Sequence, residues 1–505
     1  MRPSARAPLI AAAVALATCG GGAPSGGPAG ARAGAVLEHH GGPRRDGVYV
    51  DGTLTAGSAA GFHVDPAFHA STSGRIYAQP LYVPGAGGPD LVVAATEQDV
   101  VAAFDARTGA TAWSRKLGEP VALSALSCGN IDPLGVTGTP IADPAARTLY
   151  VAAMTTPDGG RTKRHLVFAL SLDDGSTRAG WPVSVAEVAR RQGLRFEDAD
   201  QNQRGALALA AGTLYVPFGG HYGDCGTYRG FLFAIPTATP AGATAWSAGA
   251  PGGGIWAPSG VASDRGQLFV ATGNTFGATA WSGGEAVLRF QAGASVSGGP
   301  ADSFAPRNWR DLDAGDTDLG GTGPVLVDVP GATPSALVVV LGKDGKIYLL
   351  DRGRLGGVGG QLATTQVARG AIINAAAAYT TARGTYVVFR GTGQGCPSGQ
   401  SGDLTAVRLS PGSPPTAAVA WCARQNGKGS PMVTTTDGHA NAIVWSVGAE
   451  GDGRLRGFDG DSGAVVYGGG GPGDALGEVA RFQTPILAGG RIFVATKDGV
   501  KALTR

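Results

Sequence analysis

Residues 91–113, LVVAATEQDVVAAFDARTGATAW, indicate the fold that we expect for this chain. Residues 91–95 and 101–105 are short, apolar and rich in β-branched or small side chains, which is typical of buried strands. A turn around Gly109 follows, and residues 110–113 form a third apolar run that ends at Trp113. Three short strands joined by tight turns predict an antiparallel meander.

The same pattern recurs along the chain about every 50–70 residues, so we interpret it as an internal repeat. Its most apolar strand is found eight times. The eight copies begin at Leu91, Leu149, Leu214, Leu268, Leu337, Tyr386, Ile443 and Ile492.

Four antiparallel strands per unit, repeated eight times, predict an all-β fold, an eight-bladed β-propeller over residues 46–505. A single sheet cannot bury both of its faces, whereas radial stacking buries each face against the next blade. Because the eighth unit stops at Leu503, we expect a strand near residues 48–50 to complete it. A short helix of one or two turns is expected at 185–192.

Composition excludes several classes of function. Lys and Arg number 40 against 38 Asp and Glu, so nothing indicates a nucleic-acid partner. No apolar run is long enough to span a bilayer. Gly (86) and Pro (32) are abundant, which fits a fold with many turns.

The first residues resemble a bacterial lipoprotein signal: Arg2 and Arg6 precede a short apolar stretch that ends at Cys19. We expect a signal peptide at 1–18, a lipidated Cys19 and a Gly/Ala/Pro-rich tether at 19–45. The alternative is an ordinary secretory peptide that is removed together with Cys19. Either way the chain is expected to be exported to the cell envelope, in the periplasm or at the outer membrane, with membrane contact only through a lipid anchor.

Four further cysteines suggest two disulfides, as expected for an exported protein. Cys396 and Cys422 flank one expected hairpin and are the first pair that we predict, which leaves Cys128 with Cys225. Four cysteines allow three connectivities, so the other two stay open.

Loops that enter a blade and loops that join its second and third strands lie on one face of a propeller. Placing the repeat in register brings a set of polar and aromatic residues to that face, where long loops also gather. They are Asp200, Asn202, Arg204, His221, Cys225, Trp256, Asn274, Asp316, Asp318, Lys343 and Asn374. Carboxylate and amide oxygens suit Ca²⁺, and a Trp offers a flat stacking surface.

The phrases FDARTGATAW (104–113) and GKDGKIY (342–348) resemble the repeat of quinoprotein propellers, which use pyrroloquinoline quinone (PQQ). The segments GIW (254–256), ATGN (271–274), DTDLG (316–320) and GKDG (342–345) resemble, in order, the site motifs of quinoprotein alcohol dehydrogenases. The resemblance implies that Trp256 stacks on PQQ, that Asn274 and Asp318 hold Ca²⁺, and that Asp318 is the catalytic base. Lys343 would touch the quinone, Arg204 is a further candidate for cofactor binding, and Asp200 lies near the family's third metal ligand. The implied activity is the oxidation of an alcohol or sugar with a separate electron acceptor.

The chain departs from these enzymes in lacking an adjacent cysteine pair and a fused cytochrome. Poorly characterised exported propellers share the phrases YAQPLY (77–82) and NQRG (202–205), so a non-catalytic envelope lipoprotein that binds protein or glycan is the alternative function. In that case Trp256 packs between blades, Asn274 bonds only to its own loop, and Lys343 is a turn residue.

Overall fold

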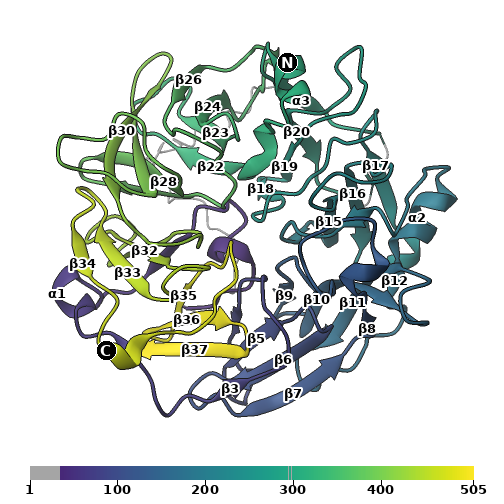
Figure 1. Cartoon of the computed structure of the whole chain (residues 1–505), viewed down its shortest axis with the longest axis horizontal. Helices are drawn as coiled ribbons and strands as arrows, with labels where there is room; N and C mark the ends of the chain where they lie inside the picture. Colours follow the sequence, from purple (N-terminus) through teal and green to yellow (C-terminus); the bar gives the residue numbers. More distant parts are fainter. Residues whose placement is uncertain (1–33, 294, 297) are drawn as a thin grey trace, which may run out of the picture. The chain divides into compact units, whose positions relative to one another are not determined.

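The computed structural model describes residues 34–505 apart from 294 and 297, and in this part eight antiparallel sheets form a ring (Figure 1). The predicted eight-bladed β-propeller is confirmed. The signal peptide and Cys19 lie outside the described residues. The first strand of a blade lies nearest the centre, as β9, β18 and β22 do in Figure 1.

Blades one to four follow one another along the chain. They are built from β4 (Leu81–Val83), β5 (Leu91–Ala95), β6 (Val100–Asp105) and β7 (Thr111–Lys116); β9 (Ile141–Asp143), β10 (Thr148–Thr156), β11 (Arg164–Ser171) and β12 (Val183–Ser184); β14 (Ala208–Ala210), β15 (Thr213–Gly220), β16 (Phe231–Pro236) and β17 (Thr244–Ser247); and β18 (Ala262–Asp264), β19 (Gln267–Thr272), β20 (Ala286–Gln291) and β21 (Asp302–Ala305).

Blades five to eight complete the ring. They are built from β22 (Val325–Asp328), β23 (Ala336–Leu341), β24 (Lys346–Asp351) and β26 (Ala363–Gln366); β27 (Ala377–Thr381), β28 (Gly384–Arg390), β29 (Leu404–Ser410) and β30 (Thr416–Ala423); β31 (Met432–Thr435), β32 (Ile443–Val447), β33 (Leu455–Asp459) and β34 (Val465–Tyr467); and β35 (Ile486–Ala488), β36 (Arg491–Thr496) and β37 (Gly499–Thr504).

Short additional strands extend some sheets: β8 (Glu119–Pro120), β13 (Gln201–Asn202) and β25 (Gly357–Val358). Helices are few and short in the described part: α1 (Ala56–Ala59), α2 (Val185–Arg191) and α3 (Trp309–Ala314), with 3₁₀ turns at His39–Gly41, Leu123–Ala125, Pro240–Gly242, Leu319–Gly321 and Pro472–Asp474. The expected helix at 185–192 is therefore confirmed. None of the described helices has the length and apolar character needed to cross a membrane.

The strand that closes the ring is not the one we predicted. Blade eight is completed by β2 (His63–Val64) and β3 (Ala70–Ser71), which both pair antiparallel with β37. The predicted strand, β1 (Val48–Val50), instead pairs parallel with β31 of blade seven. The reason is that the chain first runs past the centre of the ring and only then reaches its outer edge, where β37 offers a free side.

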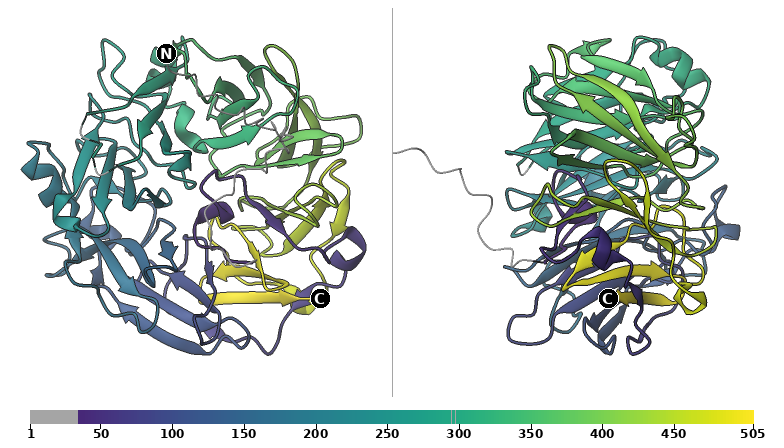
Figure 2. Two further views of the ribbon diagram at one scale, coloured as in Figure 1. Left: turned by 180° about the vertical axis from the view of Figure 1, so that it is seen from behind. Right: turned by 90° about the vertical axis from the view of Figure 1, so that its left-hand side faces the viewer.

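A central segment, residues 36–47, is the most unexpected part of the fold. Its main chain or Arg45 side chain bonds to residues in or beside the first strands of blades one to seven, and it lies at the middle of the ring (Figure 2). These partners are Tyr82, Ala142, Leu207, Ser263, Leu326, Ala378 and Val433. Residues 36–45 belong to the expected tether, so the folded body begins earlier than the predicted boundary at 46.

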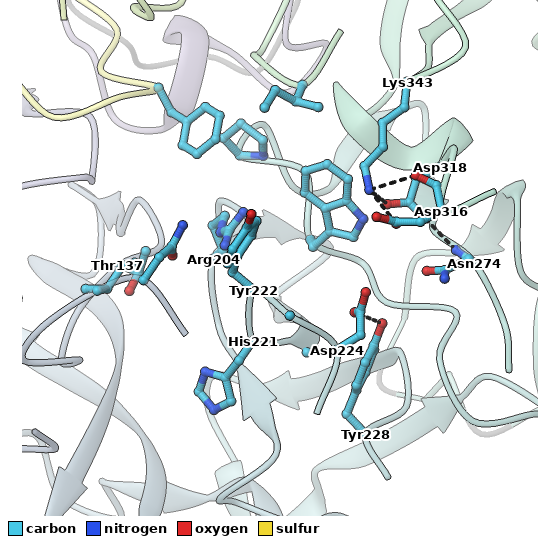
Figure 3. A pocket seen from close by; sticks show the side chains of 18 of the residues that line it. Thr137, Arg204, His221, Tyr222, Asp224, Tyr228, Asn274, Asp316, Asp318 and Lys343 are labelled. Atoms are coloured by element: carbon cyan, nitrogen blue, oxygen red, sulfur yellow. Dashed lines mark hydrogen bonds and ion pairs between the residues drawn. The ribbon is translucent and has the colours of Figure 1, made fainter. Parts of the chain in front are cut away.

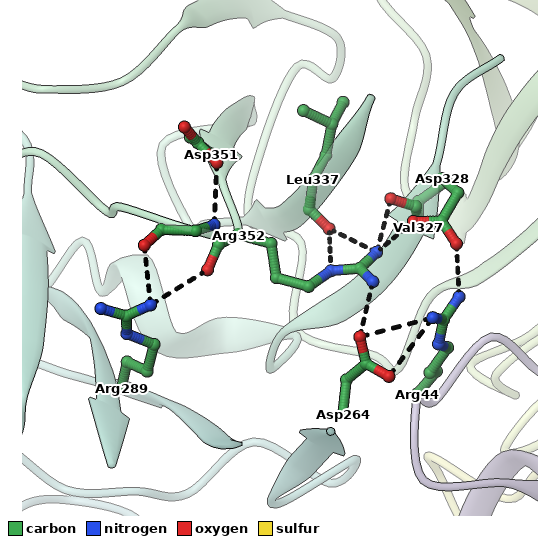
Figure 4. Close-up of polar contacts among 9 residues, drawn as sticks. Arg44, Asp264, Arg289, Val327, Asp328, Leu337, Asp351 and Arg352 are labelled. Atoms are coloured by element: carbon green, nitrogen blue, oxygen red, sulfur yellow. Dashed lines mark hydrogen bonds and ion pairs between the residues drawn. The ribbon is translucent and has the colours of Figure 1, made fainter. Parts of the chain in front are cut away.

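Arg44 anchors the central segment to blades four and five, and Arg352, which follows β24 in blade five, shares its two carboxylate partners (Figure 4). Arg44 pairs with Asp264 at 3.3 Å and with Asp328 at 2.6 Å. Arg352, of which only 6% is exposed, pairs with the same two carboxylates at 2.9 and 3.0 Å. Each charge has a partner of opposite sign, so desolvation of the two guanidinium groups is compensated.

The repeat phrase of the sequence has a packing role. Trp113 donates its indole N–H to the Leu172 carbonyl, and Gly175 in the turn that follows lies against the indole. Gly175 has φ +71°, and a Cβ there would approach the Trp113 ring to 2.7 Å. Glycine therefore lets the turn of one blade pack on the tryptophan of the preceding blade.

Both predicted disulfides are confirmed, Cys128–Cys225 and Cys396–Cys422. The first joins a loop that follows blade one to a loop of blade three. The second links the β28–β29 loop to β30 within blade six.

Candidate functional site

A cavity of about 580 Å³ opens on the face formed by the blade-entry loops (Figure 3). Its size lies within the range that small-molecule sites occupy, roughly 300–1,000 Å³. Seven of the residues predicted for this face line it: Arg204, His221, Trp256, Asn274, Asp316, Asp318 and Lys343. The structure thus brings together side chains that are up to 139 positions apart in the sequence.

Trp256, in the loop before β18, forms a flat wall of the cavity. Two glycines allow the indole to lie close to the backbone: a Cβ at Gly273 would be 2.9 Å from Trp256 Nε1, and one at Gly219 would be 3.1 Å from Trp256 Cβ. Two cations face the ring, Lys343 Nζ at 5.5 Å and the Arg204 guanidinium at 5.8 Å from its centroid. The indole is partly exposed, so its face is available to a planar ligand.

Asp318 is the central acid of the site, and only 3% of it is exposed. Its Oδ1 accepts the Asn274 backbone N–H at 2.8 Å, and its Oδ2 lies 2.7 Å from Lys343 Nζ. These contacts hold the carboxylate in one orientation at the cavity wall.

Lys343 lies in the tight turn between β23 and β24, and its backbone N–H donates to the Asp318 carbonyl at 2.8 Å. Its ammonium also contacts Asp316 Oδ1 at 2.6 Å. Burial lowers the pKa of Lys343, but the charges of Asp318 and Asp316 outweigh this effect and raise the pKa above its usual value. Lys343 is therefore a permanent cation that is both a turn residue and a cavity residue, whereas Lys497 in the similar turn is exposed and pairs with Glu478.

Asn274 follows β19, and 5% of it is exposed. Its main chain is fully used, because its carbonyl accepts from Gly253 and its N–H donates to Asp318. The side-chain amide belongs to the cavity lining beside Asp318 (Figure 3).

Carboxylates outnumber cations on this wall. Burial raises the pKa of Asp224, Asp313 and Glu285, and the neighbouring Asp318 charge raises each of them further. Glu285 is fully buried behind the wall, where Oε2 accepts the Leu319 N–H at 2.6 Å and Oε1 has no partner. An excess of negative charge with oxygen donors is the chemistry that a hard divalent cation compensates.

The donors of this wall suit Ca²⁺ in type, since Asn274 and Asp318 offer an amide and a carboxylate side by side. In the described part of the chain, however, no three His, Cys, Asp or Glu side chains converge closely enough to hold a metal by themselves. A metal here would take its remaining ligands from the amide, from water or from a bound cofactor.

Four of the residues predicted for this face do not line the cavity: Asp200, Asn202, Cys225 and Asn374. Asn202 lies in β13, where it pairs with Gly219 of β15. Asp200 accepts the Thr227 backbone N–H at 2.9 Å and does not line the cavity, so the structure does not bring it to Asn274. Asn374 donates to the Lys428 carbonyl, and Cys225 is in a disulfide. His221 does line the cavity, but it is 3% exposed and burial lowers its pKa.

Several cavity residues were missed by the sequence analysis although a periodic signal marks them. The residue four positions before a blade's first strand lines the cavity in six of the eight blades. These residues are Tyr77, Thr137, Arg204, Pro258, Ile373 and Phe482. If the register of the repeat is applied to every blade, it predicts the other five of these residues as well as Arg204. His39 has no such signal, because it comes from the central segment.

Comparison of the whole fold with solved structures gives low sequence identity but high coverage. The quinohemoprotein alcohol dehydrogenase ADHIIG from Pseudomonas putida HK5 superposes with a TM-score of 0.66 at 12% identity, covering 93% of this chain and 80% of that chain. The corresponding enzyme from Comamonas testosteroni gives 0.63 at 15% identity, covering 94% and 80%. A europium-containing methanol dehydrogenase gives 0.59 at 13% identity, covering 93% and 91%.

No protein-family model matches the chain, and no curated protein matches it in sequence. The fold is therefore the eight-bladed propeller found in quinoprotein alcohol dehydrogenases, with a polar cavity on one face. At 12–15% identity these similarities show the fold alone, so the chemistry must be argued from the cavity.

Proposed function

We propose that this protein is an exported quinone-dependent dehydrogenase of an alcohol or sugar. The observation that supports the proposal is the meeting of Trp256, Asn274, Asp318 and Lys343, from four separate segments, in one cavity of about 580 Å³. A flat aromatic wall, a buried carboxylate and a fixed cation in one pocket suit a planar anionic cofactor next to a hydroxyl substrate.

Each residue has a role that its contacts allow. Trp256 would stack on PQQ, and Asn274 with Asp318 would hold Ca²⁺. Bound there, PQQ would accept two electrons from the substrate, and Ca²⁺ would stabilise negative charge on oxygen. Asp318 would accept the proton of the substrate hydroxyl, because it is the acid that the Asn274 N–H and Lys343 hold in place. Lys343 would contact the quinone and hold the Asp318 carboxylate in place.

The remaining parts of the proposal concern the cellular setting. Electrons would leave through a separate acceptor. Export to the periplasm or outer membrane, with lipidation at Cys19, stays part of the proposal. The disulfides Cys128–Cys225 and Cys396–Cys422 agree with an oxidising compartment.

The test is reconstitution of the purified protein with PQQ and Ca²⁺, followed by calorimetry for binding and by dye reduction with alcohols and sugars for activity. We expect Asp318→Asn to retain PQQ binding and to lower the rate by roughly 10²–10⁴-fold, the usual contribution of a general base. Asp311→Asn is the matched control, because Asp311 lies on α3 near the site but does not line the cavity; its rate should be unchanged.

Absence of PQQ binding with Ca²⁺ present would refute the proposal. The alternative, a non-catalytic propeller that binds an envelope protein or glycan, predicts in addition that Asp318→Asn leaves binding of that partner intact.

A further inference from the structure

The opening of the cavity to solvent carries exposed aromatic side chains. Among the residues that the structure describes, five large hydrophobic side chains are exposed: Val50, Tyr222, Phe276, Val358 and Val465. The two aromatic ones, Tyr222 at 66% and Phe276 at 37% exposure, both line the cavity, whereas the three valines do not. Exposed apolar side chains that gather at one hollow of the surface mark a binding site.

Two exposed carboxylates lie at the same opening. Asp224 and Asp316 line the cavity together with Tyr222 and Phe276, and all four are exposed. We call these four residues the mouth of the cavity.

The loop between β15 and β16, which carries Tyr222, is held at two points. The Cys128–Cys225 disulfide ties it to the loop that follows blade one. Within the loop, Asp224 Oδ1 accepts the Tyr228 hydroxyl at 2.8 Å (Figure 3). Because the loop is fixed before a ligand arrives, little conformational entropy is lost when a ligand covers Tyr222.

Phe276, in the β19–β20 loop of the next blade, belongs to the same wall. Its ring packs against Tyr228 with the centroids 5.7 Å apart and the planes at 84°. The preceding residue, Thr275, donates its N–H and its hydroxyl to the Asp313 carboxylate at 2.9 and 2.7 Å, which anchors the loop. Tyr228 therefore connects both aromatic residues of the mouth, since it bonds to Asp224 on one side and packs on Phe276 on the other.

Both carboxylates of the mouth can accept further hydrogen bonds. Asp224 Oδ1 bonds to Tyr228, Asp316 Oδ1 lies 2.6 Å from Lys343 Nζ, and 63% of the Asp316 side chain is exposed. A carboxylate offers about four acceptor positions, so these contacts leave room for other donors. Hydroxyl groups are the neutral donors that a ligand would bring.

This combination suits a sugar ring better than a simple alcohol. A pyranose presents C–H groups on its faces and hydroxyls around its edge, so its faces can cover the aromatic rings while its hydroxyls reach the carboxylates. An apolar alcohol would cover the rings but would remove the carboxylates from water without giving them donors, which is unfavourable. An open-chain polyol has the hydroxyls but no rigid apolar face.

We propose that the mouth of the cavity binds a sugar in its pyranose form, with the two aromatic rings stacked on the sugar and the two carboxylates accepting its hydroxyl groups. Of the two substrate classes in the proposed function, the mouth selects the sugar, and as an assignment of the substrate this inference rests on that function. Binding of the sugar requires neither PQQ nor turnover, so it is measured separately.

The experiment is saturation-transfer NMR on the full-length protein without PQQ. The probes are the methyl pyranosides of glucose, galactose and mannose. Two matched ligands each lack one feature: D-glucitol has the hydroxyls without a ring, and cyclohexylmethanol has a ring with a single hydroxyl. We expect at least one pyranoside to bind about fivefold more tightly than both matched ligands, with the strongest transfer to its ring C–H protons.

Four variants assign the binding to residues. Tyr222→Ala and Phe276→Ala should each lower the affinity for that pyranoside by about twofold to tenfold, the usual contribution of an aromatic contact. Tyr222→Trp keeps a flat ring and should retain the affinity. Val465→Ala is the control, because Val465 is 62% exposed on β34 but does not line the cavity, and its affinity should be unchanged.

Three results would overturn the inference: no pyranoside binds, cyclohexylmethanol binds as tightly as the best pyranoside, or both alanine variants bind like the unmodified protein. Because the ligands are compared on the unmodified protein, the test decides even if a variant fails to fold. If a pyranoside binds as expected and PQQ does not, the sugar subsite stands and the dehydrogenase proposal fails. If PQQ binds and alcohols reduce the dye but no pyranoside binds, the dehydrogenase proposal stands and the sugar subsite fails.

Discussion

The two sides of the cavity differ in how their charges are satisfied. The Lys343 ammonium contacts the carboxylate of Asp316 at 2.6 Å and that of Asp318 at 2.7 Å. The second oxygen of Asp318 accepts the Asn274 backbone N–H. Around Arg204, in contrast, the guanidinium makes no ion pair with any described residue, and its Nε is buried without a hydrogen-bond partner. The charges of the first side are paired within the protein, whereas the guanidinium of the second side has no counter-ion in contact.

This difference predicts how a charged residue on each side contributes to the stability of the fold. A paired charge stabilises the fold and orients its partner before any ligand arrives, while an unpaired buried charge costs stability that ligand binding recovers. Substitutions on the two sides should therefore change the free energy of unfolding in opposite directions.

The largest effect is expected on the paired side. Lys343→Met removes the cation between Asp316 and Asp318 and leaves Asp318, with 4% of its side chain exposed, uncompensated. We expect the free energy of unfolding to fall by about 2 kcal/mol, less than for a fully buried pair because Lys343 keeps some exposure.

Urea denaturation at neutral pH measures this change. Lys346→Met is the matched control, since Lys346 pairs with Asp344 at a longer 3.4 Å and should cost less than about 1 kcal/mol. Equal losses in the two variants would show that the Asp316–Lys343–Asp318 contacts do not stabilise the fold.

An intermediate effect is expected from Asp99, which lies behind the Arg204 side. It is fully buried, both carboxylate oxygens lack partners, and burial followed by the Glu97 charge raises its pKa to about 9. An acid whose folded pKa is raised loses stability as pH rises from its unfolded pKa to its folded pKa. The loss should therefore accumulate between about pH 4 and about pH 9.

Asp99→Asn should remove this loss and stabilise the protein by about 1–2 kcal/mol at about pH 8, because asparagine has no proton to release on unfolding. At about pH 4 the variant and the unmodified protein should be equally stable, which serves as the internal control. Denaturation curves at the two pH values decide this, and a variant that is destabilised at both would contradict the assignment.

The fold could be predicted from the sequence more completely than the cavity, because the two depend on different kinds of sequence pattern. Eight repeats of short β-branched runs require a closed ring, and Trp113 with the Gly175 turn shows why the repeat phrase is needed for blade packing. The order of Trp256, Asn274, Asp318 and Lys343 also placed them on the correct face.

What sequence could not predict was determined by contacts between distant segments. Residues 36–45 fall within the predicted tether, but they lie in the centre of the ring, where the Arg45 side chain donates to the Leu207 and Val261 carbonyls. The position of Asp200 in the sequence predicts a metal ligand, but in the structure its carboxylate accepts the Thr227 backbone N–H. Glu97 lies in an ordinary hairpin turn, and the effect of the Arg204 charge on it can be seen only in the folded structure.

The smallest effect, and the one of opposite sign, is expected for Arg204 itself. Arg204 is partly buried and makes no ion pair with any described residue, and partial desolvation lowers its pKa. Arg204→Met keeps the apolar contacts with Trp256 and Phe482 and removes a partly buried, unpaired charge, so the free energy of unfolding should stay unchanged or rise by up to about 1 kcal/mol.

The matched comparison is Arg352→Met, which removes a buried guanidinium that does have partners. Arg352 pairs with Asp264 and Asp328, so its loss should cost about 3 kcal/mol. Thermal and urea denaturation of both variants, without added ligand, measure the contrast. If Arg204→Met were destabilised as much as Arg352→Met, Arg204 would be a structural residue of the propeller and not an unpaired charge at the cavity.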